Sequence, residues 1–532
     1  MRKRCFVINQ LIFTNENTIR FTTYCTGSFL RPFRKSTNTN CLRKLESNNV
    51  RAVIHNGGDM FYNLDFTPGF EVPGGSGKHT LFGAALWIGG LDAGRNLHLA
   101  AMTYRQGGYD FYPGPLDTTT GTTTGPAVQA WDSIWAISRA EVEAFKAGGP
   151  ITSGIANWPG NSSNTRHSKR MAPFVDADKN GLYEPQHGDY PEVRGSQTLY
   201  WVMNDQFAAH TETGGEPLGI EVHATAFVLD TADGNPLDNT VYLEFRIINR
   251  SQHTYDSLYY GMFADFDIGF GFDDFIGSNP DLNAFFGYNG DSFDDGSQGY
   301  GAQPPVQSIA FIGQDLSHFM YYNNDFTSQG NPESPIEYYH YLRGRWKDGS
   351  ALTRGGDGYK GTTPATHAYP GDPGNSSEWS EESENHQPGD RRGIGSVGPV
   401  RFAPGDELQL TVASIFHPNT GSGQLGAFSR MEDDIQAVAE YYTQNFPTGL
   451  PRQPAQGRLV LFPNPAQITL GITSSAPIKE IRVLDLSGRE MSVSANLQVN
   501  HAELNVSALS PGLYFIRIFT EKEVLTKRWI KH

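Results

Sequence analysis

Short apolar runs that alternate with polar residues, each closed by glycine, proline or asparagine, recur throughout this chain of 532 residues. In the stretch VYLEFRIIN, the side chains of Val241, Leu243, Phe245 and Ile247 fall on one side of an extended backbone. A period of two is typical of a β-strand with one face on a core, whereas helices repeat every three to four residues. The 59 glycines and 32 prolines supply the turns that such strands need. The pattern predicts a mainly β protein built from sandwich-like sheets with few helices.

Residues 49–446 carry most of these runs and predict a β-rich body with room for two subdomains. The continuous apolar run at 81–88 predicts a buried strand, with 97–104 as its hairpin partner. Residues 241–249 and 257–266 are separated by a short polar turn and predict a second strand pair. Residues 398–404 and 407–416 predict a third pair for the same reason.

Helical patterns in the body are few. Residues 138–141 read Ser-Arg-Ala-Glu, a capping box that predicts the start of a short helix. Residues 424–446 place apolar side chains at intervals of three and four, which predicts one long amphipathic helix. Residues 371–390 are polar and rich in serine and glutamate, so we expect them to be the least ordered part of the body.

Residues 457–532 form a separate β pattern behind a proline-rich linker at residues 447–456. Four motifs follow one another here: FPNPA, DLSGR, LNVSALSPGLYFIRI and VLTKRWIKH. In this order they resemble the type A C-terminal sorting domain of the type IX secretion system of Bacteroidetes, the Por secretion tail. The resemblance implies an immunoglobulin-like sandwich of seven strands, recognition by the outer-membrane translocon, and in most cases removal by a sortase. The implied destination, reached through the periplasm, is the cell surface or the medium.

The body has a resemblance of its own. The phrases DADKNGLYEPQHGDYP, DNTVYLEFRIINRS and ADFDIGFGFDDFIGSN are similar to the N-terminal region of an uncharacterised family of Bacteroidetes proteins that carry the same sorting domain. The similarity extends over most of residues 49–446. The resemblance implies where the protein is located but not what the body does.

Charge is distributed unevenly along the chain. The formal net charge is −16, but residues 1–48 carry +7, so the remainder carries −23. An acidic body repels phosphate backbones, which argues against nucleic acid as a partner. No run of about twenty apolar residues occurs, so the sequence predicts no transmembrane segment.

Residues 1–48 also differ from the body in their cysteines. Cys5, Cys25 and Cys41 all lie in this segment, and therefore no disulfide can link two parts of the body. The basic start and the interrupted apolar run that follows it suggest either an atypical signal peptide or a translation start placed too early. We favour the second interpretation, because charge and cysteine content change together, and we expect the segment to be disordered and outside the native fold.

One loop has the pattern of a calcium site. Asp176, Asp178 and Asn180 occupy alternate positions, Gly181 follows, and the Leu182 carbonyl and Asp189 complete the predicted ligands. Oxygen ligands at positions one, three, five and seven, with glycine at position six, form the first half of a calcium-binding loop. The alternative is a surface turn held by its own aspartate and asparagine side chains. We expect bound calcium to have a structural role, because it would hold loops that no disulfide holds.

A second acidic cluster follows a predicted strand. It contains Asp265, Asp267, Asp273 and Asp274, four carboxylates within ten residues. Such a group repels itself unless it is solvated or bridged by a cation. A weaker metal site at the strand end and a solvated loop are both consistent with the sequence.

The sequence shows no catalytic motif: no HExxH, no GxSxG, and no cysteine in the body that could act as a nucleophile. We therefore expect an exported, calcium-supported β-sandwich protein that acts in adhesion, binding or envelope structure and is not an enzyme. The alternative is a secreted hydrolase acting on polysaccharide or protein. A third reading, a module that binds surface glycans, depends on aromatic side chains that the sequence suggests are exposed: Trp131, Trp135, Trp158, Tyr321, Tyr322, Tyr338, Tyr339 and Tyr341.

Overall fold

A computed structural model describes residues 41–446, 459–462, 466–474, 477–485, 489–499, 501–520 and 524–531. The predicted linker at 447–456 and most of the N-terminal segment lie outside these residues. Residues 41–48, by contrast, belong to the folded body. β1 (Leu42–Leu45) pairs with β2 (Arg51–His55), and Leu45 is fully buried. The boundary predicted at residue 48 is therefore too late.

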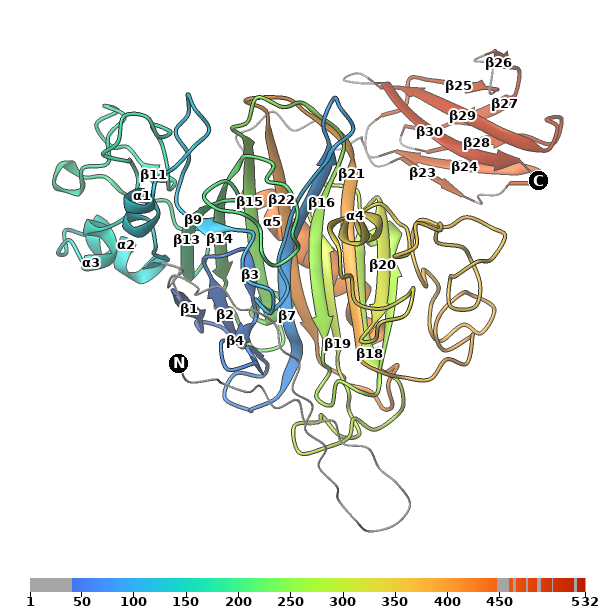
Figure 1. Cartoon of the computed structure of the whole chain (residues 1–532). Coiled ribbons are helices and arrows are strands. Elements are labelled where there is room, and N and C mark those ends of the chain that lie inside the picture. Colours follow the sequence, from blue (N-terminus) through green and yellow to red (C-terminus); the bar gives the residue numbers. More distant parts are fainter. Residues whose placement is uncertain are drawn as a thin grey trace, which may run out of the picture. The chain divides into compact units, whose positions relative to one another are not determined.

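The body contains two antiparallel nine-stranded sheets (Figure 1). The first, sheet A, consists of β1, β2, β3 (Asp59–Met60), β6 (Phe70–Glu71), β7 (His79–Leu91), β8 (Leu97–Ala101), β16 (Tyr255–Phe266), β20 (His318–Asn323) and β21 (Arg391–Phe402). The second, sheet C, consists of β9 (Tyr112–Pro113), β10 (Trp135–Ser138), β13 (Gln197–Asn204), β14 (Ile220–Val228), β15 (Thr240–Asn249), β17 (Asp274–Asn279), β18 (Ala284–Asn289), β19 (Val306–Phe311) and β22 (Glu407–His417). Two short ribbons, β4 (Tyr62–Asn63) with β5 (Thr67–Pro68) and β11 (Phe174–Val175) with β12 (Tyr190–Pro191), lie outside the sheets.

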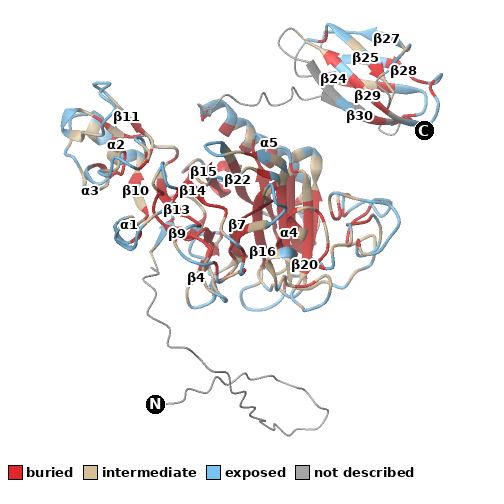
Figure 2. Ribbon diagram, turned by 45° about the horizontal axis from the view of Figure 1, so that its top comes forward, coloured by how far each residue is buried: buried red, intermediate tan, exposed pale blue. Residues whose placement is uncertain are grey.

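The inner faces of the two sheets share one apolar core. Trp87 and Phe263 of sheet A and Leu243 and Phe245 of sheet C all belong to it, and each is fully buried. In β15 the predicted alternation holds, because Val241, Leu243, Phe245 and Ile247 all point into this core. Figure 2 shows the buried strands as a continuous red interior. The body is thus a β-sandwich, as the alternation predicted.

The outer face of sheet C is covered by α5 (Phe428–Asn445), the long helix that the sequence predicted. Met431, Ile435, Val438 and Tyr442 are buried at helical spacing. The Tyr442 hydroxyl donates a hydrogen bond to the Glu244 carboxylate at 2.6 Å. Sheet C is therefore buried on both faces, and β14 and β15 are each buried at all but one position.

The other helices are short. They are α1 (Gly125–Ala130), α2 (Arg139–Lys146), α3 (Ser153–Ala156) and α4 (Pro335–Leu342), with 3₁₀ turns at Pro185–His187, Pro236–Asn239 and Pro280–Leu282. The predicted capping box begins α2, since Ser138 and Glu141 each accept a hydrogen bond from the other's backbone N–H. The structure contains no helix, within the residues it describes, that is long and apolar enough to cross a membrane.

Two predicted strand pairs are wrong. β15 and β16 are consecutive, but β15 pairs with β14 and β22 in sheet C, whereas β16 pairs with β7 and β21 in sheet A. β21 and β22 are likewise divided between the sheets. Each connection is thus a crossing from one sheet to the other. A short polar turn is compatible with a hairpin and with a crossing, and local sequence does not distinguish them. The predicted hairpin of β7 with β8, in contrast, is confirmed.

Residues 371–390 are also more ordered than predicted. Trp379 is buried in the body core, and its indole N–H donates to the Gly356 carbonyl at 3.0 Å. Glu381 is fully buried and pairs with Arg391 at 3.0 Å. The composition of the segment suggested disorder, but these two side chains attach it to the sandwich.

The C-terminal module is a second, smaller sandwich. It consists of β23 (Leu459–Phe462), β24 (Thr469–Ser474), β28 (His501–Asn505) and β27 (Ser494–Leu497) in one sheet, and β26 (Glu490–Met491), β25 (Glu480–Leu484), β29 (Gly512–Phe519) and β30 (Val524–Lys531) in the other. Leu470, Ile472, Val483 and Ile516, taken from both sheets, share one buried cluster. The described residues thus form eight strands, where the resemblance implied seven.

Truncation of an inward-facing side chain tests the shared core. Leu243→Ala should lower the free energy of unfolding of the body by about 2–5 kcal/mol, because it removes a fully buried side chain and leaves a cavity. Chemical denaturation monitored by tryptophan fluorescence measures this loss. Glu407→Gln, at an exposed position on neighbouring β22, should change stability by less than about 0.5 kcal/mol. Equal effects of the two substitutions would contradict the placement of Leu243.

Candidate functional site

The Asp176 loop, residues 176–189, connects β11 to β12, and the pairing of these two strands holds its ends together. Carboxylate oxygens of Asp176, Asp178 and Asp189 lie within 4.8 Å of one another. Asp189 is fully buried and accepts the backbone N–H groups of Ala177 and Glu184, each at 2.8 Å. The structure thus brings together the three carboxylates that the sequence singled out.

The middle of the loop turns sharply at Gly181, whose φ of +83° favours glycine. The Gly181 N–H donates to Asp176 Oδ2 at 2.8 Å, and the Asn180 side-chain amide donates to Asp178 Oδ2 at 2.9 Å. Asn180 Oδ1 accepts the Leu182 N–H at 2.7 Å. These bonds shape the turn from within. The donor set contains only oxygen atoms, which suits a hard cation such as Ca²⁺.

A second group of carboxylates lies where β16 ends and β21 begins. We call Asp265, Asp267, Asp390 and Arg392 the Arg392 group. Oxygens of its three carboxylates lie within 4.8 Å of one another, and Asp265 is opposite Arg392 in the β16–β21 register. The guanidinium lies 3.4 Å from Asp265 Oδ2 and 2.9 Å from Asp390 Oδ1. The Tyr104 hydroxyl donates to Asp265, while Asp265 Oδ1 has no hydrogen-bond partner.

One guanidinium faces three carboxylates in this group, and its charge cannot balance them all. Burial raises the pKa of Asp265 to about 7, with Arg392 opposing and Asp390 reinforcing the shift. Burial and the charge of Asp265 raise the pKa of Asp267 well above its usual range. Without an added cation, the group therefore takes up protons near neutral pH.

The structure divides the second predicted cluster. Asp265 and Asp267 belong to the Arg392 group, whereas Asp273 and Asp274 do not, and Asp390 takes their place. Asp390 was missed because it lies in the segment expected to be disordered, 125 positions after Asp265. The only sequence signal was its position directly before the basic pair Arg391-Arg392 at the start of a strand.

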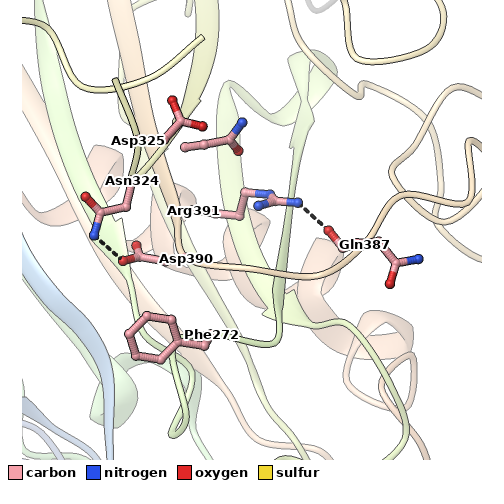
Figure 3. A pocket seen from close by; sticks show the side chains of 7 residues that line it. Phe272, Asn324, Asp325, Gln387, Asp390 and Arg391 are labelled. Atoms are coloured by element: carbon pink, nitrogen blue, oxygen red, sulfur yellow. Dashed lines mark hydrogen bonds between the residues drawn. The ribbon is translucent and has the colours of Figure 1, made fainter. Parts of the chain in front are cut away.

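A hollow of about 450 Å³ opens beside the Arg392 group (Figure 3). It is lined by Phe272, Asn323, Asn324, Asp325, Gln387, Asp390 and Arg391. Its polar groups largely pair with one another: Asn324 donates to Asp390 at 2.9 Å, and Arg391 donates to the Gln387 carbonyl at 2.6 Å. Phe272 is 68% exposed at its edge. The hollow is thus an open, polar depression with one aromatic ring beside it.

The aromatic residues expected to form a sugar-stacking surface do not form one. Trp158, Tyr321, Tyr322, Tyr338, Tyr339 and Tyr341 are buried, and Trp131 and Trp135 are half-buried. Tyr338, Tyr339 and Tyr341 lie on α4, which packs against sheet A, and this packing explains their burial. In the described part of the chain, strongly exposed rings are instead phenylalanines such as Phe272 and Phe326.

Comparison with known proteins identifies the C-terminal module. Residues 460–532 match the family described as secretion system C-terminal sorting domain. The chain therefore carries a type IX secretion sorting tail and is exported to the cell surface or the medium. The match agrees with the order of motifs from FPNPA to VLTKRWIKH.

The comparisons say less about the body. A search of curated proteins found no match. Among solved structures, a polysaccharide lyase is similar at 9% identity and a TM-score of 0.26, over 59% of this chain and 34% of the lyase. The chain thus spans about a third of the length of that enzyme. A similarity this low supports no conclusion about the activity of the body.

The Arg392 group predicts a pH dependence of stability. The pKa of Asp265 is about 7 in the folded protein and about 3.9 in the unfolded chain. Between these two pH values the folded state binds more protons than the unfolded state. The free energy of unfolding of metal-free protein should therefore fall as pH rises from about 4 to about 7. Asp265→Asn should reduce this slope by up to about 1.4 kcal/mol per pH unit.

Denaturant unfolding in metal-free buffers from pH 4 to pH 8 measures the slope. Asp256→Asn is the matched control, because Asp256 lies on the same strand but its side chain is 69% exposed. It should leave the slope unchanged. A slope that Asp265→Asn does not alter would show that this carboxyl group titrates normally in the folded state.

Proposed function

We propose that the exported body is a binding protein of the cell surface or its surroundings, acting in adhesion or envelope structure, with calcium bound in the Asp176 loop. The sorting tail carries the first part of this proposal, since it fixes where the body works. The calcium assignment is supported by the carboxylate oxygens of Asp176, Asp178 and Asp189, which lie within 4.8 Å of one another. A β-sandwich with apolar sides facing inward and polar loops outward suits a binding role.

Calcium would act here as a structural cross-link. Residues 42–532 contain no cysteine, so no disulfide can fix the loops of the body. The Asp176 loop is 14 residues long and mostly exposed, and its carboxylates repel one another when no cation is present. Extracellular sites often bind calcium with dissociation constants of about 0.1–1 mM, which millimolar calcium outside the cell would fill.

The alternative function, a secreted hydrolase, is supported by one observation. Asp390 lies at the hollow and brings an oxygen within 4.8 Å of both Asp265 and Asp267. Against this, Asp265 is 2% exposed and is paired with Arg392, so substrate cannot reach it. An assay of purified protein for release of reducing ends or peptides distinguishes the two functions, and Asp390→Asn should abolish any hydrolysis that occurs at the hollow.

Removal of residues 457–532 tests export. The truncated body should remain inside the cell envelope, because the translocon no longer recognises it, while the full chain reaches the surface or the medium. Fractionation and immunoblotting measure the distribution. The full chain with Glu503→Gln, a change at an exposed position of β28, is the control and should be exported normally. Normal export of the truncated body would contradict the role of the tail.

Asp178→Asn tests the calcium assignment. The substitution removes one ligand charge from an exposed loop, so the folded protein should bind one calcium ion fewer per chain, as counted by isothermal titration calorimetry. Its affinity at the loop should fall at least tenfold. Asp281→Asn, at an exposed carboxylate in another turn, should bind as many ions as the unaltered protein. Unchanged binding by Asp178→Asn would show that the loop is only a hydrogen-bonded turn.

A further inference from the structure

Asp273 and Asp274, which the Arg392 group leaves out, lie at the start of β17, next to the end of β18. The β17–β18 register places Asp274 directly opposite Asn289. Side chains opposite each other in an antiparallel pair start from Cβ atoms about 5 Å apart, close enough to share one ligand. The Gly290 N–H donates to the Asp273 carbonyl at 2.6 Å, which fixes the Asp273 backbone beside them. We call Asp273, Asp274 and Asn289 the Asp274 cluster.

Oδ1 of Asp274 and Oδ1 of Asn289 are shielded from solvent and accept no hydrogen bond, whereas the Asp273 carboxylate, also shielded, has the Asp295 backbone N–H beside it. Asp274 and Asn289 are both fully buried. Asn289 uses its amide N–H to donate to the Asp291 carbonyl at 3.0 Å, which fixes the orientation of its oxygen. Leaving a buried polar atom unpaired costs about 1–3 kcal/mol, and more for a charged group. Two such atoms on directly opposite residues indicate an absent partner.

The surrounding charges make the cluster more unfavourable still. Burial raises the pKa of Asp273 to about 6, with Asp294 as the strongest reinforcing charge, and burial and Asp267 raise the pKa of Asp274 well above its usual range. Asp294 is itself held in place, because it accepts the N–H groups of Phe270 and Tyr300. The loop packs so closely here that a Cβ atom at Gly269 would lie 2.1 Å from Asp294 Oδ2.

The contrast with the Arg392 group is informative. There, a guanidinium within 3.4 Å supplies positive charge to the carboxylates. At the Asp274 cluster, the neighbouring charges that most affect the pKa of Asp273 and of Asp274 are those of other aspartates. Lys78 influences Asp294, but its ammonium group donates to the Gly299 carbonyl at 2.8 Å. The fold thus places a guanidinium within ion-pair distance of the first group, whereas other aspartates dominate the charge around the second.

We propose that the Asp274 cluster is a second divalent-cation site, with oxygens of Asp273, Asp274 and Asn289 as ligands and Ca²⁺ as the natural ion. All the unpaired atoms are oxygens, which Ca²⁺ and Mg²⁺ prefer over softer ligands. The mixture of carboxylate and amide oxygens in an irregular arrangement favours Ca²⁺, because Mg²⁺ requires a near-octahedral shell. The ion would connect β17, β18 and the flanking loops. The site is independent of the Asp176 loop and of the proposed binding role.

Calcium titration of the full chain and three variants tests the site. The metal-free protein is titrated with CaCl₂ by calorimetry, and its melting temperature is measured in parallel. Asp178→Asn disables the Asp176 loop, Asp274→Asn disables the Asp274 cluster, and Asp390→Asn alters the Arg392 group as the matched control. The Asp274→Asn change keeps the side-chain shape, and circular dichroism checks that the variant folds.

We expect two ions for the full chain, one for each of the Asp178→Asn and Asp274→Asn variants, and two for the Asp390→Asn variant. Calcium should raise the melting temperature of the Asp274→Asn variant less than that of the full chain. A purely structural role for Asp274 would lower the melting temperature without changing the number of ions bound. Should Asp274→Asn still bind the same number of ions, or should Asp390→Asn instead lose one, the proposed site is wrong. If Asp178→Asn loses an ion and Asp274→Asn does not, calcium binding by the Asp176 loop is supported and only the proposed Asp274 site is wrong.

Discussion

The interior shared by the two sheets is the constraint on which the body depends. Trp87 and Phe263 from sheet A stack with ring centroids 5.2 Å apart in a core to which Leu243 and Phe245 of sheet C also belong. Burial of apolar surface is the largest favourable term in folding, and no disulfide supplements it here. α5 adds a second apolar layer on the outer face of sheet C, where Tyr242 stacks on Phe227. Stability therefore resides in the layers, and the loops at the strand ends depend on them.

Those loops carry an unusual concentration of buried negative charge. The Arg392 group and the Asp274 cluster lie close together, since the charge of Asp267 raises the pKa of Asp274. Placing several carboxylates in one low-dielectric region is costly unless counter-charges accompany them. Arg392 neutralises part of this negative charge through its ion pairs with Asp265 and Asp390. On the proposal made above, a divalent cation outside the cell would balance the rest of the charge.

The sequence predicted the elements better than their connections. Alternation identified β15, the capping box identified the start of α2, and helical spacing identified α5, because each depends on residues that are close together in the chain. The hairpins at 241–266 and 398–416 were wrong, because the choice between pairing and crossing depends on strands distant in the sequence.

The candidate sites follow the same rule. The Asp176 loop is a continuous segment, so its three carboxylates could be named in advance, whereas Asp390 reaches Asp265 only through the β16–β21 pairing. Asn289 was missed for a similar reason, since its role comes from its position opposite Asp274. The tyrosines of α4 were judged exposed because a short aromatic helix gives no sign of which layer will cover it.

The crossings between the sheets have a consequence for how the chain is made. β15 receives one of its two neighbours, β22, only when residues 407–417 have been synthesised, and β16 must wait for residues 391–402. Until then, strands in the middle of both sheets present open hydrogen-bonding edges, the kind of surface that promotes aggregation. The body cannot complete its fold from the N-terminus onward while it emerges from the ribosome. Central strands of both sheets therefore lack a hydrogen-bonding neighbour until almost the whole body has been translated.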